Sequence, residues 1–187
     1  ISQHLDIENY IKDWIIIGGL TGSGKTDFLR SFKESIDLEQ IANHRGSAFG
    51  VRDSGQPTQS NFENILTLDY LNHKYEKLIL EDESRTIGRA GLPGFWYQKM
   101  QSSKLVILEV DDDKRAENIY YEYVYDEINN GNSEDKLLEK YLGSLNNIKR
   151  RLGNVVYDNI KDLMKSAFHQ NEKEIHKEWI LTLLTSY

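Results

Sequence analysis

The sequence predicts an α/β fold in which a parallel sheet is covered by helices and followed by a helical C-terminal region. Short apolar runs alternate with helical stretches between Trp14 and Val110, as they do in stacked βαβ units. A glycine-rich turn follows the first apolar run. After Asp113 the apolar residues recur only at helical spacing. We therefore expect a single domain over residues 1–187, with an α/β core over 1–113 and a mainly helical part over 114–187.

Three apolar runs are expected to form the parallel strands, namely Trp14–Gly18, Lys77–Glu81 and Lys104–Val110. Their apolar residues are continuous rather than alternating, which is typical of strands that are covered on both faces of a sheet. Ser35–Leu38 is expected to add a short further strand.

Helices are expected between these strands and after the last one. The first should cover Gly24–Lys33, directly after the glycine-rich turn. Ser60 followed by Glu63 fits a capping box, so a second helix is expected to begin there. Asn171 with Glu174 fits the N-terminal cap of the last helix.

Composition excludes several classes of function. The chain has 23 Lys and Arg against 30 Asp and Glu, a net charge of −7, so no overall positive field draws it to nucleic acid or to a membrane. It has no cysteine, which excludes disulfides, thiolate metal sites and a cysteine nucleophile. The longest apolar stretches are far shorter than the roughly 20 residues that a membrane span needs. We expect a cytoplasmic protein without a membrane partner.

The turn Gly19–Thr26 is the strongest functional signal in the sequence. Its residues, Gly-Leu-Thr-Gly-Ser-Gly-Lys-Thr, match the phosphate-binding pattern G-x-x-x-x-G-K-[ST] completely. Glycines let successive backbone N–H groups turn around an anion, and the following helix adds the positive end of its dipole. The fold is therefore expected to be P-loop NTPase-like. The predicted phosphate-binding residues are Gly19, Thr21, Gly22, Ser23, Gly24, Lys25 and Thr26.

Three acids, Glu81–Glu83, end the strand predicted at Lys77–Glu81. A carboxylate at the tip of a strand resembles a Walker B acid, which orients Mg²⁺ beside the phosphates. Glu81 and Asp82 are the better candidates, because Glu83 could pair with a neighbouring arginine. We predict that Mg²⁺ binds to Thr26 and Asp82. A solvated acidic strand end is the alternative.

Two further segments carry groups that suit an anion or a substrate. Arg85 and Arg89 follow the acids, and the planar guanidinium of arginine binds phosphate through two parallel hydrogen bonds. The alternative is a surface salt-bridge face with the acids. His44, Arg45 and Ser47 share one loop, for which a structural role is the alternative. The candidate catalytic residues are Lys25, Arg45 and Arg85; the candidate substrate-binding residues are His44, Arg45, Ser47, Arg85 and Arg89.

Together these segments resemble the P-loop half of the tRNA 2-selenouridine synthase family. The resemblance extends from about Trp14 to the end of the chain, although its specific motifs stop near Pro93. The P-loop is shared with many proteins, whereas the other strings are far more specific. They are Asp37-Leu38-Glu39, Ala42–Gly50, Gln56–Gln59, Phe62–Asn64, Glu81–Gly88 and Leu92-Pro93.

The resemblance implies a transferase that acts on the wobble 2-thiouridine of tRNA. Such enzymes geranylate the sulfur with geranyl diphosphate and exchange it for selenium with selenophosphate, and an upstream rhodanese-like domain supplies the reactive cysteine. This chain has no cysteine, so it is expected to be a separated domain or the P-loop subunit of a split enzyme. Its expected partners are tRNA and a rhodanese-like domain or subunit. The phosphate-bearing ligand stays open between geranyl diphosphate, selenophosphate and ATP or GTP.

Two other functions fit the same residues. A P-loop, a strand acid and nearby arginines also describe a small-molecule or nucleoside kinase. A non-catalytic tRNA-binding module that senses phosphate is the other alternative. That module would need its basic residues to converge on one face, namely Arg85, Arg89, Lys99, Lys104 and Lys149–Arg151.

Overall fold

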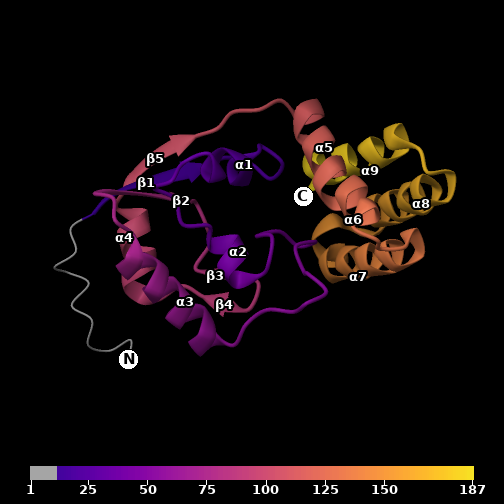
Figure 1. Cartoon of the computed structure of the whole chain (residues 1–187). Helices are drawn as coiled ribbons and strands as arrows, with labels where there is room; N and C mark the ends of the chain where they lie inside the picture. The colour runs from indigo at the N-terminus through magenta and orange to yellow at the C-terminus, as the bar shows by residue number, and fades with distance from the viewer. Residues whose placement is uncertain (1–11) are drawn as a thin grey trace. The chain divides into compact units, whose positions relative to one another are not determined.

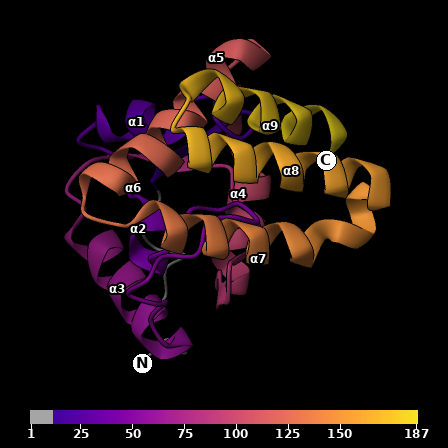
Figure 2. The same ribbon diagram turned by 90° about the vertical axis from the view of Figure 1, so that its right-hand side faces the viewer.

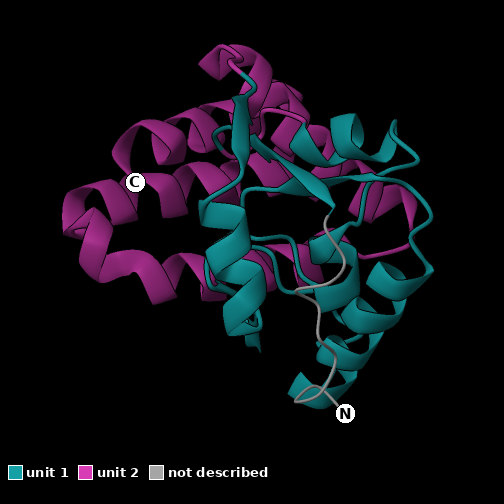
Figure 3. Ribbon diagram, turned by 90° about the vertical axis from the view of Figure 1, so that its left-hand side faces the viewer, with its two compact units in different colours: residues 1–20, 25–108 teal, residues 21–24, 109–187 magenta. Residues whose placement is uncertain are grey.

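The computed structural model describes residues 12–187, which belong to two compact units (Figure 3). The first, here called the sheet unit, comprises the described residues 12–20 and Lys25–Leu108. The second, the helical unit, comprises Thr21–Gly24 and Glu109–Tyr187. By its contacts, the middle of the glycine-rich turn therefore groups with the helical unit.

Three parallel strands form the sheet, in the order β2-β1-β5. They are β1 (Asp13–Gly18), β2 (Lys77–Glu81) and β5 (Lys104–Ile107) (Figure 1). In the register, Ile16 of β1 lies opposite Leu80 of β2. The predicted α/β fold with a parallel sheet and C-terminal helices is confirmed.

The predicted strand at Ser35–Leu38 is wrong. Only Ser35 bridges to the sheet, opposite Ile79, and the Ile36 amide donates to the Ile79 carbonyl at 3.1 Å. Asp37 then accepts a hydrogen bond from the Gln40 amide at 2.8 Å and caps the short helix α2 (Leu38–Ala42). This side-chain cap ends the extended segment because it favours the helix that follows.

The prediction that β5 is covered on both faces is wrong, because its side chains are exposed. Leu105 is 51% exposed and Ile107 is 52% exposed. In contrast, Ile16 on the central strand is 2% exposed. β5 and β2 are both outer strands of the sheet, but only β2 is buried, so the continuous apolar run overestimated the burial of β5.

The main core lies on one face of the sheet, against α3 (Gln59–Asn72) and α4 (Gly94–Gln101). Successive side chains of a strand point to opposite faces, so β1 contributes Trp14 and Ile16 to this core and Ile17 to the other face. On that second face, Ile17 packs with Leu29 of α1 (Lys25–Arg30). The remaining buried members of the main core are Ile36, Leu38, Ala42, Phe62, Leu66, Tyr70, Leu78, Leu80, Ile87, Ala90, Leu92, Trp96 and Met100.

The capping box predicted at Ser60 and Glu63 is wrong, because α3 begins earlier. Thr58 has an extended backbone and its side chain accepts from the Asn61 amide at 3.3 Å, so it is the N-cap. Gln59 then makes two hydrogen bonds to the backbone of Gly91, both at 2.8 Å. They join the start of α3 to the hairpin of β3 (Thr86–Ile87) and β4 (Ala90–Gly91).

The helical unit contains α5 (Asp112–Tyr120), the π-helical turn η2 (Tyr121–Tyr125), α6 (Asp126–Asn129), α7 (Glu134–Leu152), α8 (Asn154–Gln170) and α9 (Lys173–Ser186). In Figure 2, α7, α8 and α9 lie in succession, and each packs against the next. The cap predicted at Asn171 is wrong: this residue is left-handed at the C-terminal end of α8, and Glu172 precedes α9. Among the described residues, no helix is both long enough and apolar enough to cross a bilayer.

Candidate functional site

The turn between β1 and α1 presents backbone amides that have no partner. Gly22 and Gly24 have φ values of +81° and +78°, a left-handed conformation that favours glycine. A Cβ on Gly22 would also lie 2.7 Å from the Arg115 carbonyl oxygen. Within residues 12–187, no amide from Leu20 to Gly24 donates a hydrogen bond to another backbone group. A run of unpaired amides in a glycine-rich turn of this kind suits an anion.

Helix α5 holds the carbonyl groups of the same turn within the helical unit. Arg115 Nε donates to the Thr21 carbonyl and Asn118 Nδ2 donates to the Gly22 carbonyl, both at 2.9 Å. Arg115 is buried and also pairs with Asp112. Ser23 is buried, and its hydroxyl has no hydrogen-bond partner in the described structure. The turn is thus tied down by its carbonyls while its amides and the Ser23 hydroxyl stay uncommitted.

Lys25 and Thr26 follow the turn in the sheet unit. The Lys25 ammonium donates to the carbonyls of Gly19 at 2.8 Å and Leu20 at 3.2 Å, so it lies over the first residues of the turn. The Thr26 hydroxyl donates to Glu81 Oε2 at 3.3 Å. Glu81 ends β2, which pairs in parallel with β1. The pairing therefore brings the acidic end of β2 next to the start of α1.

Glu81 belongs to a cluster of three carboxylates with Glu39 of α2 and Glu83. Each offers an oxygen, and these oxygens lie within 4.8 Å of one another. Glu81 is 1% exposed, and its Oε1 has no hydrogen-bond partner among residues 12–187. We call this group the carboxylate cluster.

Burial and mutual repulsion keep protons on the carboxylate cluster. Burial, followed by the negative charges of Glu39, Asp37 and Glu83, raises the pKa of Glu81 to about 8. Burial, followed by the charge of Glu39, likewise raises the pKa of Glu83 to about 8. Near pH 7 these groups therefore need either protons or a cation. Carboxylate oxygens are ligands that Mg²⁺ prefers, so the cluster suits this ion.

The loop with His44, Arg45 and Ser47 lies against the carboxylate cluster. The Gly46 amide donates to Glu39, and a Cβ on Gly46 would lie 2.8 Å from oxygens of both Glu39 and Glu83. His44 and Arg45 are buried, and Ser47 accepts from the Phe49 amide at 3.2 Å. Burial, and then the charge of Arg52, lowers the pKa of His44. His44 is thus a neutral, buried ring.

Arg85 and Arg89 are exposed on either side of the β3 strand. Between them, Gly88 has φ +59°, and a Cβ there would lie 2.7 Å from the His44 ring. Gln56 joins the two segments through three hydrogen bonds to backbone groups. Its amide nitrogen donates to the carbonyls of Ala42 and Ile87, and its oxygen accepts from the Arg89 amide at 2.7 Å. The two segments predicted to contact substrate therefore meet in the sheet unit.

The comparisons with known proteins identify the family. A family model described as "tRNA 2-selenouridine synthase AAA domain" matches residues 12–187. The chain belongs to this family. It is 46% identical to a tRNA 2-selenouridine synthase of Shewanella sp. (strain ANA-3), over 91% of this chain and 51% of that protein. It is 39% identical to the tRNA 2-selenouridine synthase of Pseudomonas syringae pv. syringae, over 92% of this chain and 51% of that protein.

The chain spans about half the length of the curated relatives that it matches. No solved structure matches it.

Within the AAA domain, the predicted residues lie in three places. Lys25 and Thr26 stand beside the carboxylate cluster, and the Thr26 hydroxyl contacts Glu81 rather than the exposed Asp82. His44, Arg45 and Ser47 lie on the loop beside Glu39, and Arg85 and Arg89 flank the segment that packs on His44. Thr21, Gly22, Ser23 and Gly24 group with α5.

Sequence reasoning missed four residues of the site. Glu39 was noted only as part of the Asp37-Leu38-Glu39 string and was not predicted as a site residue. The available signal was its acidic side chain, which lies in the first turn of the helix that Asp37 caps. Gln56 gave no signal of its three backbone contacts. Arg115 and Asn118 have helical spacing, but nothing local indicates that they reach a turn more than ninety residues away.

Proposed function

We propose that this chain is the phosphate-binding part of a tRNA 2-selenouridine synthase, which acts on the wobble 2-thiouridine of tRNA with a rhodanese domain or subunit supplied elsewhere. The observation that carries the proposal is the turn Gly19–Thr26, whose amides are unpaired and whose Lys25 ammonium lies over its first carbonyls. Family membership supports tRNA as the substrate, because the relatives are named for it.

A diphosphate leaving group gives the turn a clear chemical task. In geranyl transfer, the sulfur of 2-thiouridine forms a bond to C1 of geranyl diphosphate, and the C1–O bond breaks. The diphosphate departs with the electron pair, so negative charge grows on its oxygens. Lys25 and the loop amides would stabilise that charge. The N3 proton that the thiouridine ring loses on S-alkylation would pass to the solvent, so no general base is needed. Selenophosphate would use the same phosphate contacts in the later exchange of sulfur for selenium. ATP or GTP would fit these contacts too.

The arginines and the His44 loop are assigned to the substrate. We assign Arg45 and Arg85 to stabilise charge with Lys25, and His44, Ser47 and Arg89 to contact substrate. The support is their proximity: Gly88, which lies between the two surface arginines, packs on the His44 ring. The same loop contacts Glu39 of the carboxylate cluster.

A Mg²⁺ ion fits the residues beside Lys25. The support is Glu81 Oε1, which is buried without a hydrogen-bond partner in the described structure. We place the ion on Thr26 and Glu81, with Glu39 and Glu83 as further oxygen ligands and Asp82 exposed at the neighbouring position. When bound, such an ion neutralises charge on the phosphates.

Calorimetric titration with inorganic pyrophosphate tests the proposal directly. Removing a charged donor costs roughly 1.5–3 kcal/mol, so Lys25→Ala should weaken binding at least about tenfold and up to about 150-fold. Lys165→Ala, on an exposed position of α8, is the matched control and should bind as the wild type does. Equal affinity of Lys25→Ala and wild type would contradict the proposal.

Activity separates the transferase from the kinase alternative. The chain is mixed with its rhodanese partner, tRNA and geranyl diphosphate, and geranylated tRNA is measured by mass spectrometry. Lys25→Ala should lose this product, and Lys165→Ala should keep it. Transfer of the γ-phosphate from ATP to a nucleoside by the chain would instead support a kinase and contradict the transferase.

A further inference from the structure

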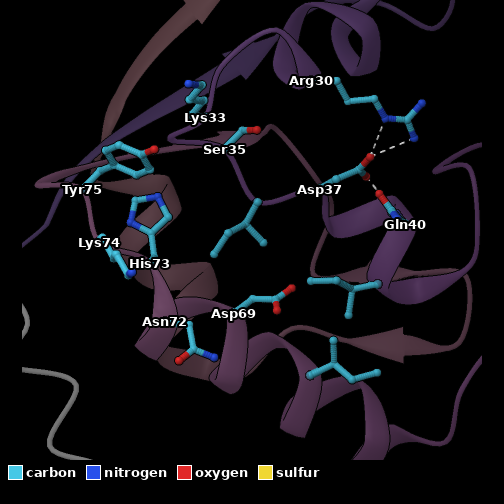
Figure 4. Close-up of a pocket in the computed structure, with 13 residues that line it drawn as sticks. Arg30, Lys33, Ser35, Asp37, Gln40, Asp69, Asn72, His73, Lys74 and Tyr75 are labelled. Carbon is cyan, nitrogen blue, oxygen red and sulfur yellow. Dashed lines mark hydrogen bonds and ion pairs between the residues drawn. The ribbon is translucent and has the colours of Figure 1, made fainter.

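A cavity of about 700 Å³ lies in the sheet unit, apart from the residues assigned to phosphate (Figure 4). Its lining comes from two stretches of chain, residues 30–41 and residues 65–75. Small-molecule sites in proteins usually measure about 300–1,000 Å³, so the cavity has the size of a ligand site.

The lining combines an apolar surface with polar groups. Ile36, Ile41 and Ile65 supply the apolar part. Lys33, Ser35, Asp69, Asn72 and Lys74 are among the polar residues. A ligand with flat apolar faces and a polar edge matches this mixture, whereas an isoprenoid chain would leave the charged groups desolvated.

The two walls of the cavity are held in place by their own hydrogen bonds. On one wall, His73 Nε2 lies 2.9 Å from the Glu34 carbonyl, and Lys12 Nζ donates to the His73 carbonyl at 2.6 Å. On the other, the Arg30 guanidinium pairs with Asp37 at 2.9 Å. The cavity is therefore formed before a ligand enters, which lowers the cost of binding.

Tyr75 extends the His73 wall with an accessible aromatic ring. Its ring lies 5.4 Å from that of His73, edge to face, and Tyr75 is 40% exposed. A partly exposed ring that is fixed by a neighbour offers a stacking surface.

Four polar groups of the cavity have no partner within residues 12–187. Lys33 and Lys74 form no ion pair there, and the side chains of Asp69 and Asn72 form no hydrogen bond. Asp69 and Asn72 are three residues apart on α3, so their side chains share one face of the helix. Figure 4 shows the Asp69 carboxylate between the His73–Tyr75 wall and the wall of Arg30, Asp37 and Gln40.

We propose that this cavity binds one unpaired nucleotide of an RNA, with its base against Tyr75, its polar edge at Asp69 and Asn72, and its phosphates at Lys33 and Lys74. Bases in single-stranded RNA stack on aromatic rings and expose their hydrogen-bonding edges, and lysines neutralise the adjacent phosphates. The inference rests on the proposed function for RNA as the class of substrate. It also explains how a chain with a net charge of −7 can hold RNA, namely through a local site.

The short helix α2 connects this cavity with the carboxylate cluster. Asp37, its N-cap, lines the cavity, and Glu39, in its first turn, belongs to the cluster. A nucleotide in the cavity would therefore lie on the same element as the groups beside Lys25.

Fluorescence anisotropy with a labelled single-stranded oligomer of ten uridines, and with an RNA duplex of equal length, tests the cavity. Loss of one stacking contact should weaken single-strand binding about tenfold in Tyr75→Ala, whereas Tyr75→Phe should stay within about twofold of wild type. The double variant Lys33→Glu, Lys74→Glu should bind more weakly and show a shallower dependence on salt. Lys165→Glu, exposed on α8, is the control for reversal of a lysine outside the cavity and should bind as wild type does.

A second readout keeps the result independent of folding and of the P-loop. Each variant is titrated with inorganic pyrophosphate, which the cavity variants should bind normally and Lys25→Ala should not. If Lys25→Ala binds pyrophosphate normally while the cavity variants lose RNA, the phosphate proposal fails and the cavity inference stands. The inference is overturned if the wild type does not prefer the single strand. It is also overturned if Tyr75→Ala, the isosteric Asp69→Asn and Asn72→Asp, and the double lysine variant all bind RNA as Lys165→Glu does. Photo-crosslinks of 4-thiouridine RNA that map exclusively outside residues 30–41 and 65–75 also overturn it.

Discussion

Buried polar groups are satisfied in the helical part of the molecule and unsatisfied beside the P-loop. In the helical unit, the Tyr141 hydroxyl donates to the Tyr123 carbonyl, and Trp179 Nε1 donates to His176 Nδ1 at 3.1 Å. Between Glu109 and Tyr187, no buried side-chain nitrogen or oxygen lacks a partner. In the sheet unit, Glu81 Oε1 and His44 Nδ1 have none.

This difference separates the residues that stabilise the fold from those that await a ligand. An unpaired buried polar atom costs roughly 1–3 kcal/mol, so such atoms persist where a bound molecule or ion satisfies them. Residues 109–187 avoid this cost because their buried polar atoms are hydrogen-bonded. Glu81 in the carboxylate cluster and the Ser23 hydroxyl in the phosphate-binding turn each have an unpaired buried oxygen and therefore bear the cost.

The largest effect is expected for Glu81→Gln, which should weaken binding and raise stability together. Loss of this ligand should reduce Mg²⁺-dependent pyrophosphate binding roughly 100-fold, on the scale seen when groups that support a metal are removed. The ligand-free protein should become more stable, because an uncharged amide replaces a buried carboxyl whose pKa is about 8. Calorimetry and thermal melting measure the two effects.

The stability gain should depend on pH in a defined direction. Unfolded, Glu81 ionises near pH 4.5, whereas folded it keeps its proton up to about pH 8. The folded state therefore holds the extra proton, and the wild type loses stability as pH rises from about 4.5 to about 8. Glu81→Gln should thus gain most at pH 8.5 and least at pH 5. Asp82→Asn, at the exposed neighbouring position, is the matched variant, and a larger loss of Mg²⁺-dependent binding there would move the metal from Glu81 to Asp82.

Local patterns carried the predictions that succeeded. The strand Lys77–Glu81 and the turn between β1 and α1 each depend on a pattern of consecutive residues, so both could be predicted directly from the sequence. The carboxylate cluster depends instead on α2 reaching the end of β2, which no spacing along the chain reveals. The start of α3 was predicted wrongly because several polar residues near it can each act as an N-cap: Thr58 caps the helix rather than Ser60.

In the helical unit, His176 should give stability the opposite dependence on pH. Burial lowers the pKa of His176 to about 4, while the unfolded residue titrates near 6.5. The stabilising contribution is therefore complete above pH 6.5 and is lost as pH falls toward 4. Between pH 7.5 and pH 5.5 we expect protonation of His176 to lower the unfolding free energy by roughly 1 kcal/mol.

Urea denaturation of wild type and His176→Gln at the two pH values measures the contribution of His176 to the unfolding free energy. The glutamine keeps an acceptor for Trp179 but does not titrate, so its unfolding free energy should vary less with pH. Identical slopes for the two proteins would show that His176 is not a buried neutral acceptor. Wild type and His176→Gln should bind pyrophosphate with the same affinity, because His176 packs among residues that lie outside the carboxylate cluster.

The smallest effects are expected at two asparagines that share one backbone conformation, Asn43 in the sheet unit and Asn171 in the helical unit. Both end a helix in the left-handed region, at φ 48° and 51°. Asn43 Nδ2 donates to Ser54 Oγ at 2.7 Å and to the Gly55 carbonyl at 2.6 Å, whereas the Asn171 side chain makes no hydrogen bond within the described chain. Glycine adopts this conformation without a Cβ penalty. Asn43→Gly should therefore destabilise by about 1 kcal/mol, and Asn171→Gly should stabilise by about 0.5 kcal/mol. Thermal melting resolves the two signs. If both substitutions shifted the melting temperature equally, the cap conformation alone would set stability, and the hydrogen bonds that lead into the His44 loop would contribute nothing.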